Sequence, residues 1–357
     1  MTPRERVLQA IHHGKPDRVP INYMSNPGID SQLKKHYGLK QDDNEGLLLA
    51  LGVDLRRVSA PYIGKPLHTG TRTDRFVDPW HGWVTRYIEH DSGAYWDYCD
   101  FPLIEANEET IAAWPFPNPD DFDYTAFVEQ AKALDGFSLH LGDASLGCII
   151  NTCGFLRGME QVLIDLATDE PAGLLLIDKL MRWQIGKLER ELDAVHKYVD
   201  MVWIGEDLGT QHSPLISPQL LHKHILPWHK QFIDMAAAYN LPAMMHTCGS
   251  SSWAYEDYIA AGLKGVETLQ PEATNMDTRY LKDTFGGRLF FHGCLSTAGP
   301  LAYGTTNDVI EDVRNTLEIM MPGAGYIFSS THCIQDNSPL DNVIAMYDSA
   351  KEFGRYI

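Results

Sequence analysis

The stretch Pro242-Ala243-Met244-Met245-His246-Thr247-Cys248-Gly249 decides how the rest of the chain is interpreted. An apolar run bounded by proline and glycine is typical of a buried strand. Successive side chains of a strand alternate between its two faces, so we expect His246 and Cys248 to point to the same side. The stretch therefore predicts a strand that ends with an imidazole and a thiol directed at one point.

This pair of side chains indicates a metal site. Imidazole and thiolate are ligands that zinc prefers, and a catalytic zinc is held by three protein ligands with a fourth position left open. The His-x-Cys pair therefore needs one more ligand from elsewhere in the chain. Two further cysteines, Cys294 and Cys333, follow apolar runs of the same kind. A buried cysteine is often only a small core residue, and the residues alone leave both open as the third ligand.

The composition limits the classes of partner. The chain has 357 residues, 44% of them hydrophobic, which suffices for one large α/β barrel or two medium domains. It has 29 Lys and Arg residues against 48 Asp and Glu, which gives a formal net charge of −19 at pH 7. A surface this acidic repels phosphate backbones and anionic lipids, so we expect no nucleic-acid or membrane partner. The charged start of the chain and the six dispersed cysteines indicate a cytoplasmic protein without a disulfide framework.

Eight short apolar segments, separated by predicted helices, determine the expected fold. No glycine-rich phosphate turn follows the first of them, which disfavours a doubly wound open sheet. We therefore expect a (β/α)8 TIM barrel that forms a single α/β domain over residues 1–357, with an N-terminal helical extension that begins at the capping box Thr2-Pro3-Arg4-Glu5. The expected strands are 19–23, 55–59, 137–141, 201–207, 242–248, 265–268, 288–292 and 326–329.

Residues 61–119 interrupt this alternation of strand and helix. They are dense in aromatic and turn residues, including Trp80, Trp83, Tyr95 and Trp96. Polar and aromatic residues that alternate between such turns suit β-hairpins. We interpret the stretch as a β-rich insertion or lid, with a plain surface subdomain as the alternative.

In a barrel of this kind, chemistry takes place at the C-terminal ends of the strands. Most polar side chains that could act as ligands fall at those expected ends. The acidic pair Glu206-Asp207 is predicted to be catalytic, with Glu206 reaching a metal or a substrate; a satisfied loop pair is the alternative. The other candidate binding residues are Asn22, Met24, Asp143, Gln211, Gln270 and His292.

One set of segments spans nearly the whole chain: Arg4–Val7, Gly14–Pro20, Gly205–Gln211, Ser217-Pro218, His246–Gly249, and Cys333 followed by Ser338–Asn342. This set resembles the uroporphyrinogen decarboxylase superfamily. Within it, the order of the His-x-Cys pair and the distant cysteine is similar to the zinc- and cobalamin-dependent methyltransferases, which are (β/α)8 barrels. The resemblance implies that His246, Cys248 and Cys333 are the zinc ligands.

The resemblance also implies an activity. It is the transfer of a methyl group from a methylated substrate, expected to be an aryl methyl ether, to the cobalt(I) of a corrinoid protein, as in the methyltransferase component of an O-demethylase. The aromatic residues of the insertion favour a flat donor. The sequence contains no Asp-x-His-x-x-Gly segment, the cobalamin-ligating pattern of corrinoid carriers, so the cobalamin is expected on a separate partner protein.

Three alternatives remain open at this point. The first is transfer from a methylcorrinoid to a coenzyme M-like thiol or to tetrahydrofolate. The second is a metal-free enzyme similar to uroporphyrinogen decarboxylase, although residues 22–33 contain no Lys or Arg to bind a substrate with many carboxylates. The third is a non-catalytic barrel stabilised by zinc with four protein ligands, in which Glu206 or His332 is the fourth.

Overall fold

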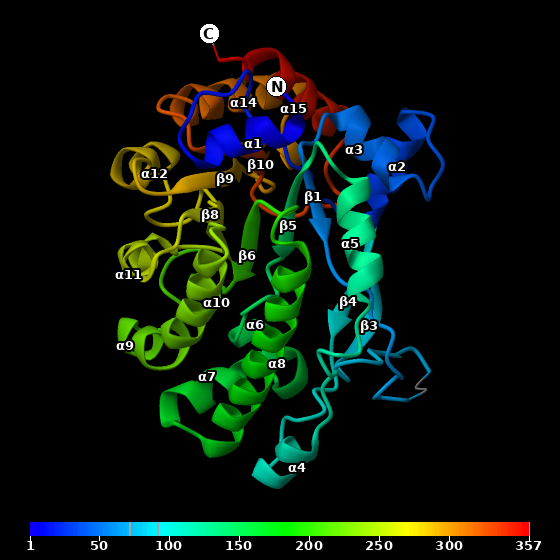
Figure 1. The fold of residues 1–357 in the computed structure, drawn as a ribbon. Helices are drawn as coiled ribbons and strands as arrows, with labels where there is room; N and C mark the ends of the chain where they lie inside the picture. The colour runs from blue at the N-terminus through cyan, green and yellow to red at the C-terminus, as the bar shows by residue number, and fades with distance from the viewer. Residues whose placement is uncertain (71–72, 91–92, 357) are drawn as a thin grey trace.

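The computed structural model describes residues 1–70, 73–90 and 93–356. Within these ranges, its main sheet has seven strands, all parallel, in the order β1-β5-β6-β7-β8-β9-β10. The sheet curls, with helices around its outside (Figure 1). The strands are β1 (Leu55–Val58), β5 (Ser138–Gly142), β6 (Met201–Gly205), β7 (Ala243–Thr247), β8 (Gly265–Thr268), β9 (Phe290–Leu295) and β10 (Tyr326–Ser330).

The first expected strand, residues 19–23, does not form a full strand. Ile21 makes a single parallel bridge to Phe328 of β10, and the Asn22 amide donates to the Phe328 carbonyl over 2.9 Å. On the other side, the amide of Asp54 donates to the Ile21 carbonyl over 2.9 Å. The proline in this segment lacks an amide hydrogen and shortens the ladder. The α/β class with a parallel, TIM-like sheet is thus confirmed, whereas a complete set of eight strands stays a prediction.

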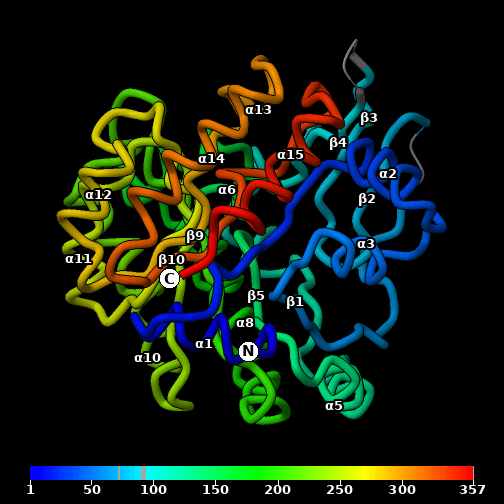
Figure 2. The backbone as a smooth tube through the Cα atoms, turned by 90° about the horizontal axis from the view of Figure 1, so that it is seen from above, coloured from blue at the N-terminus to red at the C-terminus, as the bar shows by residue number. Residues whose placement is uncertain are grey.

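Helices alternate with the strands and surround the sheet, as the view from above shows (Figure 2). Their apolar faces pack against outward side chains of the strands and form the main core. None of the helices in the described ranges has both the length and the apolar character needed to cross a membrane. The helices are α2 (Pro27–His36), α3 (Asn44–Leu51), α4 (Glu108–Ala113), α5 (Tyr124–Ala133), α6 (Ile150–Arg157), α7 (Met159–Thr168), α8 (Pro171–Val195), α9 (Pro218–Leu220) with a π-helical turn (Leu221–Ile225), α10 (Leu226–Ala238), a 3-10 turn (Ser252–Ala254), α11 (Tyr255–Ala261), α12 (Thr278–Phe285), α13 (Pro300–Tyr303), α14 (Thr306–Met320) and α15 (Leu340–Phe353).

Helix α1 (Pro3–Ile11) lies across the N-terminal end of the curled sheet (Figure 1). It begins at a capping box, because the Thr2 hydroxyl accepts from the Glu5 amide and the Glu5 carboxylate accepts from the Thr2 amide. Side chains fill the interior at this end, so a ligand site is left to the opposite end. The packed residues are Val7 and Ile11 of α1 with Leu55, Met201, Trp203, Met244, Phe290 and Ile327 of the strands.

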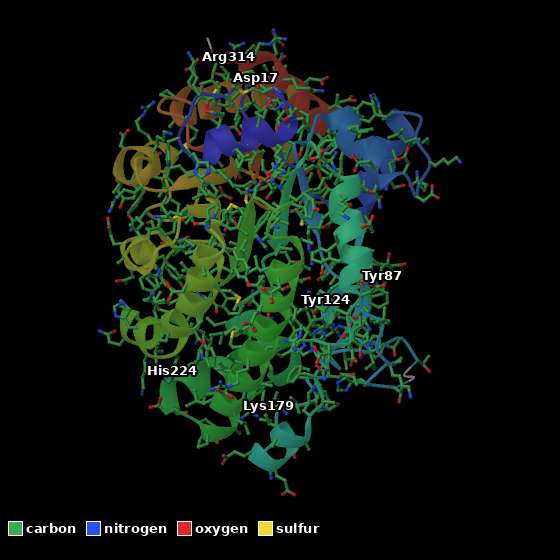
Figure 3. The ribbon with its side chains drawn as sticks, viewed as in Figure 1. Asp17, Tyr87, Tyr124, Lys179, His224 and Arg314 are labelled. Atoms are coloured by element: carbon green, nitrogen blue, oxygen red, sulfur yellow. The ribbon has the colours of Figure 1, made fainter. Side chains whose placement is uncertain are left out.

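Part of the stretch 61–119 forms a separate antiparallel sheet of β2 (Phe76–Val77), β3 (Val84–His90) and β4 (Gly93–Tyr98). Helix α4 follows it and is fixed to the body of the protein by Lys179 of α8 (Figure 3). The Lys179 ammonium donates to three carbonyl oxygens at the C-terminal end of α4, over 2.6 to 2.9 Å. The role of the stretch as an insertion or lid stays a prediction.

Candidate metal centre and substrate cavity

Side-chain alternation along the strands decides which polar residues face the interior. On β6, Trp203 points inward, and Asp207, four residues later, points to the same side. On β7, the inward residue Met244 is followed in the same phase by His246 and Cys248. The ends of two neighbouring parallel strands therefore direct a carboxylate, an imidazole and a thiol into the same space.

Asp207, His246 and Cys248 form one compact group, whose ligand atoms all lie within 4.8 Å of one another. The Cys248 thiol is 3.4 Å from His246 Nε2, and Asp207 Oδ1 is 3.6 Å from the same nitrogen. Bonds of about 2.0 to 2.3 Å to a tetrahedral zinc ion place two donors about 3.4 to 3.6 Å apart. Both the spacing and the chemistry of these three donors fit a zinc ion.

The imidazole of His246 is oriented by residues at the end of β8. Its Nδ1 contacts Glu267 Oε2, and Thr268 Oγ1 lies 3.0 Å from the same nitrogen. This contact leaves Nε2 directed at Cys248 and Asp207, which is the usual arrangement of a metal-ligating histidine. Thr268 has a φ of 89°, an unfavourable backbone conformation for a β-branched residue. Strain of this kind is concentrated at functional sites.

The charges in this group depend on one another. Burial opposes a charge on His246, but the Glu267 carboxylate and the Cys248 thiol outweigh it and raise the pKa of His246 well above its usual value. Burial also opposes a charge on Asp207, but His246 and a hydrogen bond from Asn151 lower the pKa of Asp207. Burial raises the pKa of the Cys248 thiol. A cation that binds here must therefore displace protons.

Cys333 lines the same cavity as His246 but does not belong to the compact group. Within the described ranges it forms no other compact group with His246 and Cys248. It lies in the loop between β10 and α15, and its carbonyl accepts from Gln335 Nε2 over 3.0 Å. Cys294, the other candidate for the third metal ligand, is buried in the main core. The structure thus places a carboxylate, and not a second thiol, in contact with the His-x-Cys pair.

A cavity of about 630 Å³ lies at the C-terminal end of the main sheet and reaches His246. Aromatic rings form part of its wall. Tyr98 of β4 and Phe155 of α6 stack face to face, with ring centroids 3.6 Å apart. Trp203 of β6 lines the inner end, where it also packs against the side chains beneath α1. A cavity of this size and composition fits a small, flat and largely apolar molecule.

The two arginines that line the cavity are already paired. Arg56 binds Glu45, and Arg57 binds Asp143, each with an N–O distance of 2.7 Å. The described part of the wall therefore offers no unpaired arginine or lysine. Since an anionic substrate usually requires such a partner, the wall favours a neutral one.

Glu206 faces away from the cavity, because it follows Gly205 in the outward phase of the strand. Its carboxylate accepts from the amides of Ile149 and Ile150, over 2.8 and 3.1 Å. Burial raises the pKa of Glu206 to about 8, although these two amides oppose the shift. The carboxylate predicted to reach a metal or a substrate thus binds the start of α6, and Asp207 is the member of the acidic pair that lines the cavity.

The other predicted residues are divided between the cavity wall and its surroundings. Gln270 Oε1 accepts from the Gly249 amide over 2.6 Å and so holds the turn after the His-x-Cys pair. His292 is fully buried and Gln211 is exposed, and neither lines the cavity. The predicted residues that do line it are Asn22, Met24 and Asp143.

Several residues of the site were not among the sequence predictions. A charged residue inside the apolar strand Gly265-Val266-Glu267-Thr268 is the signal that identifies Glu267. Asn151, whose amide donates to Asp207 over 2.7 Å, has no comparable signal. The same is true of His140 and Trp203, which lie within strands that look like ordinary core.

Comparisons with known proteins agree with this architecture. A family model described as uroporphyrinogen decarboxylase (URO-D) matches residues 144–353. Among solved structures, a methyltransferase from Methanosarcina mazei aligns with a TM-score of 0.66 and 15% sequence identity, over 99% of this chain and 99% of that chain. At this level of identity the match shows a shared fold. No curated protein matches the sequence.

Proposed function

The chain belongs to the uroporphyrinogen decarboxylase family, and we propose that it is a zinc-dependent methyltransferase of the corrinoid-linked branch of that superfamily. It transfers the methyl group of an aryl methyl ether to the cobalt(I) of a separate corrinoid protein. The observation that carries the proposal is the compact group of Asp207, His246 and Cys248 beside a cavity whose wall includes the stacked rings of Tyr98 and Phe155. The fold shared with a methyltransferase is consistent with it.

The proposed zinc ligands are His246, Cys248 and Cys333, with Asp207 in the fourth position until substrate displaces it. Cys333 lines the same cavity, on the loop that follows β10. The bound zinc ion would supply a Lewis acid that stabilises negative charge on the oxygen from which the methyl group departs.

The residues of the chain itself bind and orient the substrate. The stacked rings of Tyr98 and Phe155 provide a flat wall for an aromatic ring, which fixes its orientation relative to His246. Glu267 holds His246 in the orientation that presents Nε2. The largely apolar wall also limits the water that enters with the substrate.

The paired arginines weigh against the alternative substrates. A coenzyme M-like thiol, tetrahydrofolate and a porphyrinogen all carry anionic groups, whereas Arg56 and Arg57 already bind acidic partners. A neutral ether requires no such partner. The cavity therefore supports the ether as methyl donor over an anionic acceptor or a decarboxylase substrate.

A methyl-transfer assay with the zinc-loaded protein tests the proposal. Reduced cobalamin is mixed with 1,2-dimethoxybenzene, and the formation of methylcobalamin is followed by its absorbance. We expect transfer in the wild type and none in Cys248→Ala. Transfer only in the opposite direction, from methylcobalamin to a small thiol, contradicts the proposed donor. Tightly held stoichiometric corrinoid on the purified protein alone contradicts the separate partner.

A further inference from the structure

A second cavity, of about 300 Å³, lies beside the substrate cavity of about 630 Å³. Residues of the stretch 61–119 form one side of it, and residues of β1, of the loop after β5 and of helix α8 form the other. The two cavities share part of their walls, because four residues line both: Arg57, Asp143, Ser145 and Thr152. The second cavity is large enough for one aromatic ring.

Aromatic side chains connect the two cavities. The Trp83 ring lies edge-on to Tyr98 and Phe155, the stacked pair in the wall of the substrate cavity, with centroid distances of 6.1 and 5.7 Å. The His81 ring stacks on Trp83 at 4.3 Å, and the Trp183 ring lies edge-on to His81 at 5.0 Å. His81, Trp83 and Trp183 all line the second cavity. An aromatic wall therefore continues from one cavity into the other.

The tryptophan rings of the second cavity are accessible to a ligand. Trp80 is 41% exposed, and Trp83 and Trp183 are half-buried. When a further ring covers such rings, apolar surface is removed from water, and offset or edge-on ring contacts add to the gain. An aromatic group is therefore a favourable occupant.

The charged groups in the described part of this wall are already paired. Glu191 of α8 accepts from the Ala60 amide over 3.0 Å and lies 2.5 Å from the Lys187 ammonium. His81 Nδ1 lies 3.0 Å from Asp78 Oδ1. Since an ionic ligand group usually requires a partner of opposite charge, the second cavity favours a neutral occupant.

The ion pair between Arg57 and Asp143 lies on the wall that the two cavities share. Its side chains are 56% and 30% exposed, and ion pairs this open to water contribute little stability. A ligand that extends from one cavity into the other can therefore displace this pair without a large loss of free energy.

We propose that the substrate has two aromatic rings, and that the second ring binds in the cavity lined by Trp83 and Trp183. The ring that bears the methoxy group then lies in the substrate cavity, beside Tyr98 and Phe155. This inference rests on the proposed function and narrows its substrate to neutral aryl methyl ethers that carry a second ring on a short linker.

Binding of two probes to the metal-free, full-length protein tests the inference without methyl transfer. The probes are methoxybenzene and 1-methoxy-4-phenoxybenzene, which adds a second ring, and titration calorimetry measures both affinities. We expect the wild type to bind the two-ring probe roughly 10- to 100-fold more tightly, as burial of one aromatic ring allows. Excess methoxybenzene should displace the two-ring probe, because both occupy the substrate cavity.

Two variants alter the second cavity alone, since Leu146 and Trp80 line it and do not line the substrate cavity. Leu146→Trp fills the space and should remove most of the gain from the second ring. Trp80→Ala removes an exposed ring of the wall and should reduce the gain several-fold. Neither variant should change the affinity for methoxybenzene.

The matched control is Trp96→Ala. Trp96 belongs to the same stretch of the chain and is 55% exposed, but it lines neither cavity, so its replacement should leave both affinities unchanged. An equal loss of two-ring binding in Trp96→Ala and Trp80→Ala would contradict a role specific to the second cavity.

The other outcomes separate this inference from the proposed function. Equal affinities of the wild type for the two probes, binding of neither probe, a gain that survives both Leu146→Trp and Trp80→Ala, or no competition between the probes overturns the two-ring site. A gain that the variants remove, without methyl transfer from either probe to reduced cobalamin, removes the proposed function and leaves the site. Methyl transfer from 1,2-dimethoxybenzene without the gain removes the two-ring site alone.

Discussion

Replacement of Glu267 by glutamine is expected to weaken zinc binding while the protein stays folded. Glu267 is completely buried, and its Oε2 contacts His246 Nδ1 and accepts from Thr268 Oγ1 over 3.1 Å. Glutamine retains an oxygen for these contacts but lacks the negative charge that supports a ligating histidine. Loss of such a partner typically lowers metal affinity about 10- to 100-fold, which corresponds to about 1.4 to 2.7 kcal/mol.

The effect of Glu267→Gln is also expected to depend on pH. Burial opposes the positive charge on His246, but the Glu267 carboxylate contributes to the raised pKa of this histidine. In the wild type, a proton therefore competes with the metal for His246 up to a higher pH than in Glu267→Gln. The gap in zinc affinity between the two proteins should therefore widen as the pH rises. Competition with a chromogenic zinc chelator, below and above neutral pH, measures this gap.

The control for this experiment is Glu256→Gln. Glu256 is exposed and pairs with Arg288 over 2.7 Å at the surface, so its replacement should leave zinc affinity unchanged. An unaltered zinc affinity in Glu267→Gln would refute the supporting role of the buried carboxylate. An equal loss in both variants would show that the effect is not specific to the site.

Two further predictions concern stability. Since burial raises the pKa of Glu206 to about 8, the folded metal-free protein holds an extra proton between the ordinary glutamate pKa and about 8, and its free energy of unfolding should fall as the pH rises through this window. Glu206→Gln should flatten this slope in urea denaturation, and an identical slope would argue against the raised pKa. Arg157→Ala should cost about 3 to 5 kcal/mol, because it leaves the buried Asp165 carboxylate, 2.6 Å from the guanidinium, without its cationic partner. Arg288→Ala at an exposed pair should cost at most about 1 kcal/mol, and similar losses in the two variants would contradict this reasoning.

The parallel sheet could be predicted from the sequence because each strand is a short apolar run with clear boundaries. Seven of the eight expected segments form strands, and the exception, residues 19–23, contains a proline that cannot donate to the ladder. Alternation along one strand also places His246 and Cys248 on one face without any tertiary information. These features depend only on neighbouring residues.

The remaining members of the site depend on contacts between distant segments. Whether Asp207 or Cys333 approaches the His-x-Cys pair is decided by the loops after β6 and β10, whose conformations follow from packing and not from a local pattern. Alternation could have separated Asp207 from Glu206, since Trp203 and Asp207 share a phase. It could not have shown that Asn151, on helix α6 after strand β5, donates a hydrogen bond to Asp207 after strand β6.

The zinc content of the purified protein tests the proposed centre most directly. Metal analysis after zinc-replete purification should find one zinc ion per chain in the wild type and in Cys294→Ala, whose thiol is buried in the main core. Cys248→Ala and Cys333→Ala should lose most of the metal. Full zinc in both of these variants, or none in the wild type, would contradict a centre built on the His-x-Cys pair.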